Sequence, residues 1–225
     1  TIKFNKSMLN YSLLGSLNPV SGTPSLSSVE RLFERPWIDH AESCAARCLH
    51  PLENMPDYGR EISIDVGKGA LVLNLNYSQA QKETLLVRYV QLGIDLYGVL
   101  INGGQRNLEP NGGHASGRKF PILFAGVVLN DSNMKGIGSK SGDYLYTGSY
   151  GPENYPPDYL NFGEDDQTFY VLETSPGVYN YGQGGYYATD IGLPEWGINH
   201  AVRLDRDSRS WSAGYRQCCT ATSWA

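Results

Sequence analysis

Apolar side chains recur every three or four residues between Ser78 and Ile101, the spacing of one face of an α-helix. The stretch Ser78-Gln-Ala-Gln81 is a capping box, and Asn102-Gly103-Gly104 is a helix-stop signal. A second segment, Pro121–Leu129, is apolar on nearly all sides and accepts its proline only in the first turn. We therefore expect an antiparallel hairpin of an amphipathic helix and a more buried one.

Shorter elements surround this hairpin. Ser27–Phe33 predicts a short capped helix halted by Arg35-Pro-Trp37, and residues 1–27 an extended or short-helical lead-in. The apolar stretch Ile62–Leu75, with glycines at positions 67 and 69, favours a helix, a strand being the alternative. Beyond Asp131 the chain is rich in Tyr, Gly, Pro and Asn, which is typical of long ordered loops. Together these features predict a mainly α fold, in which repeated helical hairpins form a partial or complete α/α toroid with long Tyr/Gly-rich loops.

Composition and net charge limit the classes of protein to which the chain can belong. The 225 residues are 40% apolar, enough for a single domain spanning residues 1–225. The net charge of −5, from 18 Lys+Arg against 23 Asp+Glu, leaves no basic stripe for nucleic acid. The longest apolar run, Ile122–Leu129, has eight residues, so we expect a soluble protein with no membrane partner. Because the chain starts at Thr1 and its last segment resembles the start of another helix, we expect a piece of a larger protein.

Metal-capable side chains gather once, at His40, Cys44, Cys48 and His50. Their spacing matches no common zinc site, so the sequence predicts neither a metal nor another cofactor. The remaining two cysteines, Cys218 and Cys219, leave the disulfide connectivity open.

Polar and titratable residues are concentrated in loops that lead into apolar segments. Asn111-Gly-Gly-His114-Ala-Ser-Gly-Arg118 precedes the second helix of the hairpin, and its glycines leave backbone N–H groups accessible beside a titratable imidazole and a fixed cation. A helix-entry loop with a solvated arginine is the alternative. Tyr58, Arg60 and Glu61 stand in a second polar loop. We expect these loops to contribute to a binding or catalytic site.

Carboxylates are concentrated further along. Glu164, Asp165 and Asp166 precede an apolar run that contains Tyr170, while Glu195 precedes Trp196 and, after a short polar stretch, His200. Adjacent carboxylates raise one another's pKa when they are packed together, which is the tuning that a general acid needs. A solvated acidic turn is the alternative.

Five blocks together resemble a region of large secreted proteins of environmental bacteria that have no established activity. They are Arg35–His40, Glu53–Arg60, Asn111–Lys119, Phe162–Thr168 and Pro194–Gly197. More loosely, residues 60–225 are similar to the α/α-toroid polysaccharide lyases and glycosidases, including the alginate-lyase-like proteins. The resemblance implies a secreted or periplasmic bacterial protein. It also implies that Asn111, His114, Tyr58 and Arg118 correspond to the Asn, His, Tyr and Arg of those lyases.

Three functions follow, in this order. Hydrolysis of a polysaccharide needs a carboxyl pair, for which the chain offers Glu164, Asp165 and Glu195. His114 is a further candidate catalytic residue. β-Elimination on a uronate-containing glycan needs a base and a cation, for which it offers His114 or Tyr58 with Asn111 and Arg118. A non-catalytic carbohydrate-binding fragment needs only aromatic loops, which 16 Tyr and 4 Trp supply. We expect substrate contacts from Tyr58, Arg60, Asn111, Arg118, Tyr170, Trp196 and His200 around one cleft that holds His114, Glu164 and Glu195.

Overall fold

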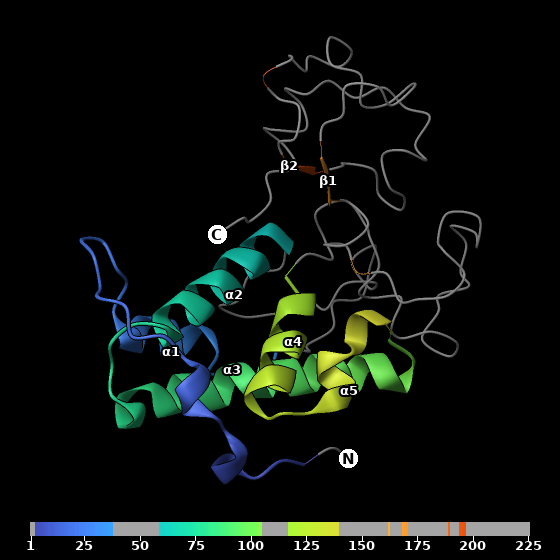
Figure 1. Ribbon diagram of the computed structural model, residues 1–225, viewed down its shortest axis with the longest axis horizontal. Coiled ribbons are helices and arrows are strands. Elements are labelled where there is room, and N and C mark those ends of the chain that lie inside the picture. Colours follow the sequence, from blue (N-terminus) through green and yellow to red (C-terminus); the bar gives the residue numbers. More distant parts are fainter. Residues whose placement is uncertain are drawn as a thin grey trace.

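The computed structural model describes residues 3–37, 59–104 and 117–139, together with the short pieces 162, 168–170, 189 and 194–196. This part of the chain is mainly helical, as the sequence predicts (Figure 1). The α-helices are α1 (Leu26–Leu32), α2 (Gly59–Leu73), α3 (Gln79–Val99), α4 (Lys119–Val128) and α5 (Ser132–Lys135). Single turns at Lys6–Met8, Tyr11–Leu13 and Ile137–Ser139 are 3₁₀, Leu100–Gly104 is a π turn, and β1 (Thr168–Tyr170) pairs with β2 (Pro194–Trp196).

Helix α3 is the centre of the helical body, and α1, α2 and α4 all pack on it (Figure 1). It begins directly after Ser78, whose hydroxyl accepts a hydrogen bond from the Gln81 backbone N–H at 3.3 Å. The Gln81 side chain accepts one from the Ser78 N–H at 2.9 Å, so the predicted capping box is present. This local signal fixed the start of the helix.

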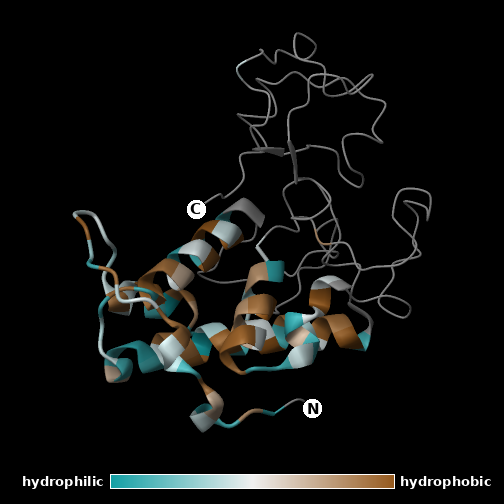
Figure 2. Cartoon of the chain, viewed as in Figure 1, coloured by the Kyte–Doolittle hydropathy of each residue, from teal (hydrophilic) through white to brown (hydrophobic). Residues whose placement is uncertain are grey.

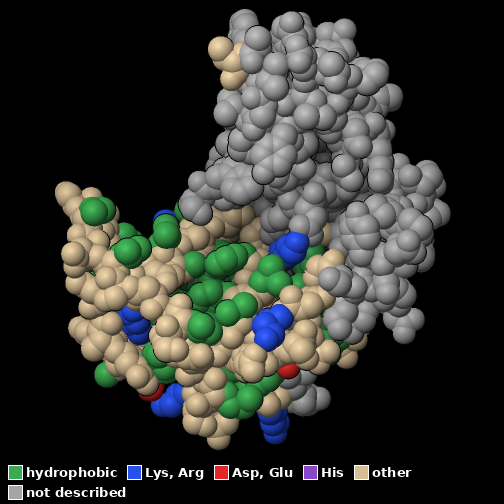
Figure 3. All heavy atoms as spheres, in the orientation of Figure 1, with side chains coloured by type: hydrophobic (Ala, Val, Ile, Leu, Met, Phe, Trp, Pro, Cys, Tyr) green, Lys and Arg blue, Asp and Glu red, His purple; other side chains and the backbone are tan. Residues whose placement is uncertain are grey.

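Helix α4 packs across α3, and both segments of the predicted hairpin are therefore helices in mutual contact (Figure 1). Pro121 is the third residue of α4, inside the first turn where its missing N–H costs nothing. The helix is apolar almost all round (Figure 2). It is less enclosed than this pattern predicts, because Phe120 and Val127 are 49% and 47% exposed. Figure 3 shows hydrophobic side chains gathered on one face of the helical part, with Lys and Arg side chains among them.

Aromatic rings join three helices in the core. Phe33, after α1, stacks on Trp37 with centroids 5.1 Å apart and contacts Tyr89 of α3 edge-on at 5.1 Å. Tyr89 in turn meets Phe124 of α4 edge-on at 4.9 Å. Gly69 of α2 faces the rings of Phe33 and Tyr89, where a Cβ would lie 2.7 Å from both. Gly69 therefore occupies a crowded contact of α2, and the helix that the sequence favours over Ile62–Leu75 is present.

The N-terminal segment is tied along the helical body. The Asn10 N–H donates to the Val128 carbonyl at 3.0 Å, and Leu17 forms a parallel bridge with Leu75. The buried Lys82 ammonium donates to the Gly15 carbonyl at 2.8 Å. These bonds hold the short-helical lead-in that the sequence predicts against α2, α3 and α4.

One boundary differs from its prediction. The cap of α1 is Ser25, whose hydroxyl accepts from the Ser28 N–H at 3.2 Å, and not Ser27. Both serines are good caps, so local sequence does not choose between them. Starting at Leu26 makes Val29 the buried residue of the helix and brings Phe33 against α3.

The stretch Gln79–Asn102 is long and apolar enough, by length and composition alone, to cross a membrane. Half of its most apolar window is buried inside the protein, as in the core helix of a soluble fold. The expectation that no membrane is a partner rested on unbroken apolar runs, and it stays a prediction.

Candidate functional site

The predicted site residues divide between described and undescribed parts of the chain. Five are described at least in their backbone position: Arg60, Arg118, Tyr170, Glu195 and Trp196. Six lie outside the described residues: Tyr58, Asn111, His114, Glu164, Asp165 and His200. The potential ligands His40, Cys44, Cys48 and His50, and the pair Cys218 and Cys219, also lie outside them.

The end of the glycine-rich loop lies against the first turns of α2. Gly117 has φ +87°, and a Cβ there would lie 2.8 Å from both the backbone nitrogen and the hydroxyl of Ser63. The left-handed backbone and the close approach both call for glycine. Arg118 follows as the N-cap of α4 and is only 1% exposed. Its place on the wall of a cleft stays a prediction. The loop that contains His114 therefore ends beside the helix that starts just after Tyr58.

Phe162, which precedes the acidic segment in the sequence, lies at the same end of α4. Phe162, two residues before Glu164, is fully buried. The Lys119 ammonium lies 5.8 Å from the centroid of its ring, within the range of a cation–π contact. The chain therefore enters the acidic segment from a fixed point at the N-terminal end of α4.

The strand after the acidic segment pairs with the strand that contains Glu195 and Trp196. β1 and β2 are antiparallel, with Phe169 opposite Glu195, Thr168 opposite Trp196 and Tyr170 opposite Pro194. Sequence reasoning missed this pairing. The signal available was the run of β-branched and aromatic residues from Thr168 to Val171, which favours a strand.

Three contacts lie next to the polar segments that the sequence analysis identified separately: Gly117 on Ser63, Lys119 over Phe162, and β1 beside β2. In Figure 1 the N-terminal ends of α2 and α4 lie on the side of the helical body that faces β1 and β2. The common cleft itself stays a prediction, because His114 and Glu164 lie outside the described residues.

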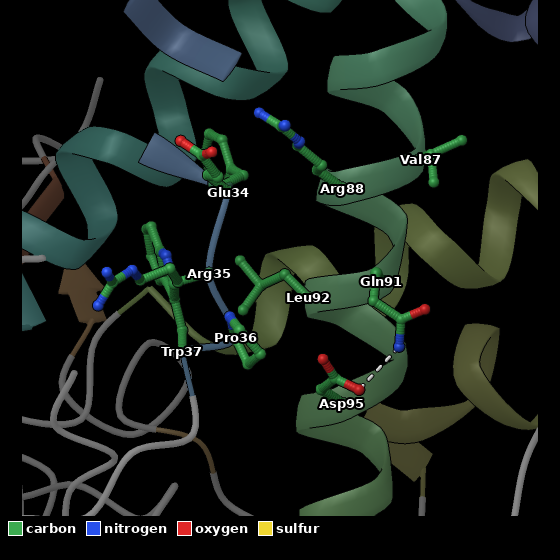
Figure 4. Close-up of a pocket in the computed structure, with 10 residues that line it drawn as sticks. Glu34, Arg35, Pro36, Trp37, Val87, Arg88, Gln91, Leu92 and Asp95 are labelled. Carbon is green, nitrogen blue, oxygen red and sulfur yellow. Dashed lines mark hydrogen bonds between the residues drawn. The ribbon is translucent and has the colours of Figure 1, made fainter. Parts of the chain in front are cut away.

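A separate cavity of about 190 Å³ lies between the segment after α1 and the middle of α3 (Figure 4). Its apolar wall comes from Phe33, Pro36, Trp37 and Leu92. The Trp37 indole N–H donates to the Leu32 carbonyl at 2.9 Å, which fixes this wall.

The polar lining of the cavity comes mainly from α3. Gln91 donates from Nε2 to Oδ1 of Asp95 at 2.8 Å, and Arg88 donates from Nη1 to the Glu30 carbonyl at 2.7 Å. Burial raises the pKa of the Asp95 carboxyl, and the hydrogen bond from Gln91 opposes this shift. In the sequence these residues look like the solvent-facing stripe of α3, because their spacing of three and four residues puts them on one helix face. The segment after α1 faces that stripe, so the structure makes it one side of a cavity.

Within the described ranges no three His, Cys, Asp or Glu side chains gather as a metal site would require. No family model matches the chain, and no curated protein or solved structure is significantly similar to it. A proposal about function therefore rests on the residues of this chain and their arrangement.

Proposed function

We propose that the protein is a carbohydrate-active enzyme that cleaves a polysaccharide by general acid/base glycoside hydrolysis. The carboxyl pair is Glu195 with Glu164 or Asp165. Tyr170 and Trp196 contribute to sugar binding on the same pair of strands. The enzyme requires no cofactor in this proposal.

The observation that supports this proposal is the register of β1 and β2. Glu195 lies opposite Phe169, and neighbouring strands are about 4.8 Å apart. The chain from Asp165 to Phe169 is only four residues long, which spans at most about 14 Å. Glycosidases need two carboxyl groups about 5 to 9.5 Å apart, a separation within reach of side chains held by one ribbon.

The chemistry assigns one task to each carboxyl group. The protonated one donates its proton to the glycosidic oxygen as the bond to the anomeric carbon breaks. The ionised one either removes a proton from the attacking water or attacks the anomeric carbon itself. Packed together, neighbouring carboxylates in residues 164–166 would supply the like charge that raises the pKa of one of them, as a general acid needs.

The test is reducing-sugar release from a panel of neutral and uronate-containing glycans. Glu195→Gln and Glu164→Gln are each expected to lower the rate by a factor on the order of 10² to 10⁴, since this is what general acid/base catalysis contributes. Glu83→Gln is the matched control, because it makes the same change at a surface ion pair with Lys6. Full cleavage by both site variants would refute the proposal.

A second candidate is a polysaccharide lyase that cleaves a uronate-containing glycan by β-elimination, and the position of three cations favours it, although the whole chain carries −5. Arg60, Arg118 and Lys119 stand at the N-terminal ends of α2 and α4, where the helix dipoles also favour an anion. An unsaturated product detected by its ultraviolet absorbance would select this candidate over hydrolysis.

The arrangement of the helices as an α/α toroid is part of the same proposal. In an α/α toroid, the loops of successive helical hairpins meet at one end of the ring, and α3 with α4 would be one of its hairpins. The long loops beyond Asp131 would then lie over that end. We also propose, from the resemblance to secreted bacterial proteins, that the protein acts outside the cytoplasm.

A further inference from the structure

We infer that the cavity between α1 and α3 binds a single uncharged sugar ring, as an ancillary site of the carbohydrate-active protein. It shares no residue with the predicted catalytic segments. Only the choice of a glycan as the natural ligand rests on the proposed function, because the ligand class follows from the lining of the cavity.

The size of the cavity sets the first limit. Its volume of about 190 Å³ equals the space of roughly six water molecules at about 30 Å³ each. Pockets for drug-sized ligands start at about 300 Å³. One six-membered ring with its hydroxyl groups fits this space.

The apolar side of the cavity is part of the packed core. Phe33 and Trp37 are stacked at an interplanar angle of 14°, and each is only 4% exposed. Leu92 beside them is 5% exposed, so the exposed Pro36 offers the apolar surface that the C–H face of a sugar ring can cover (Figure 4).

The polar lining is electrically balanced. On α3 the Asp95 carboxylate is matched by the Arg88 guanidinium, while the Arg35 guanidinium is turned away from α3 (Figure 4), so neither an anion nor a cation gains a net attraction from the α3 side of the cavity. The set contains both acceptors and donors, as do the hydroxyl groups of a neutral sugar. This balance favours a polyhydroxylated ligand without charge.

Asp95 and Gln91 are the orienting pair. Their mutual hydrogen bond holds one carboxylate oxygen, and the other is turned toward the side of Pro36 (Figure 4). Arg88 uses one of its five N–H donors on the Glu30 carbonyl, which holds the guanidinium in place. A carboxylate that is partly shielded from water makes stronger hydrogen bonds than one in bulk solvent, and the raised pKa of Asp95 is in keeping with this environment.

The experiment is ligand-observed NMR on the full chain, with glucose, galactose and mannose as neutral probes and glucuronate and glucosamine as charged ones. At least one neutral sugar is expected to bind with a dissociation constant on the order of 1 mM, as a small ligand in a shallow site does. Asp95→Asn and Gln91→Ala are each expected to weaken that binding at least tenfold, while Glu83→Gln on the same helix leaves it unchanged. Circular dichroism of each variant verifies the fold, and Gln91 is exposed, so its truncation leaves the core intact.

The outcomes separate this site from the catalytic one. Glu195→Gln is expected to abolish cleavage and to leave the NMR signal of the monosaccharide intact. Binding that disappears in Glu195→Gln and persists in Asp95→Asn would assign the sugar to the catalytic cleft and overturn the inference. No binding by any neutral sugar, or binding by the charged probes alone, would also overturn it, whatever the cleavage assay shows.

Discussion

Replacing Gly93 by alanine tests a close contact between α3 and α4. Gly93 is where α3 meets α4, and a Cβ there would overlap the carbonyl oxygen of Pro121 and lie 2.7 Å from the Cβ of Ala125. These neighbours belong to a helix backbone and a short side chain, so neither can turn away. The two helices would have to separate.

The magnitude follows from two opposing effects. Alanine is favoured over glycine inside a helix by about 1 kcal/mol. Forcing an extra carbon into a packed contact costs about 1 to 3 kcal/mol, and the upper end applies because the obstacle is backbone. We expect Gly93→Ala to lower the free energy of unfolding by about 2 kcal/mol. For a chain of this size the melting temperature should fall by about 4 to 8 °C.

Gly98 is the matched control on the same helix. In the part of the chain that the structure describes, nothing lies within 4 Å of a Cβ placed there, so Gly98→Ala should raise the stability by about 1 kcal/mol through helix propensity alone. Urea unfolding followed by far-ultraviolet circular dichroism measures both variants. If Gly93→Ala is as stable as Gly98→Ala, then α3 and α4 do not approach closely at this point and the packing described above is wrong.

Three further changes test other parts of the helical body. Tyr89→Phe removes a buried hydroxyl that donates to the Val66 carbonyl at 3.0 Å, and should destabilise the protein by about 1 to 2 kcal/mol in urea unfolding. Burial lowers the pKa of Lys82, so the folded state binds fewer protons than the unfolded state over the window just below pH 10.5, and stability rises with pH there. Lys82→Met, which also loses the bond to Gly15, should remove that rise when urea midpoints are compared between pH 8 and 10.5. Ser78→Ala should cost about 1 kcal/mol and Ser78→Gly only a few tenths, because glycine is itself an acceptable cap; equal losses would contradict the capping role.

The helices that the sequence predicts well are those with signals a few residues apart. For α3, the cap at Ser78 and the apolar spacing are local, so the start of the helix follows from the sequence. For α4, the apolar run and the position of Pro121 are equally local. Helix α2 was less secure, since its two central glycines weaken the helical pattern. Gly69 is explained only by the rings of Phe33 and Tyr89 that lie against it.

The sequence analysis did not predict the cavity, because the residues that line it lie far apart in the sequence. Arg88, Gln91 and Asp95 form a polar stripe that reads as the solvent face of an amphipathic helix. Whether such a stripe faces water or another segment depends on where Pro36 and Trp37 pass, more than fifty residues earlier in the chain. Helical periodicity does not indicate where Pro36 and Trp37 pass relative to α3.

The candidate catalytic site shows the same division between residue chemistry and arrangement. The residue types indicated a class of reactions, because carboxyl groups beside aromatic residues suit glycan cleavage. The contacts that support a shared site, Gly117 on Ser63, Phe162 under Lys119 and β1 beside β2, all join residues far apart in the sequence. Each is made by side-chain volume, ring chemistry or strand pairing, none of which a motif encodes. Since glycine at position 117 permits the closest of these approaches, Gly117→Ala should disturb the site by displacing the loop from α2, and its effect on cleavage should exceed that of an alanine at the open Gly98 position.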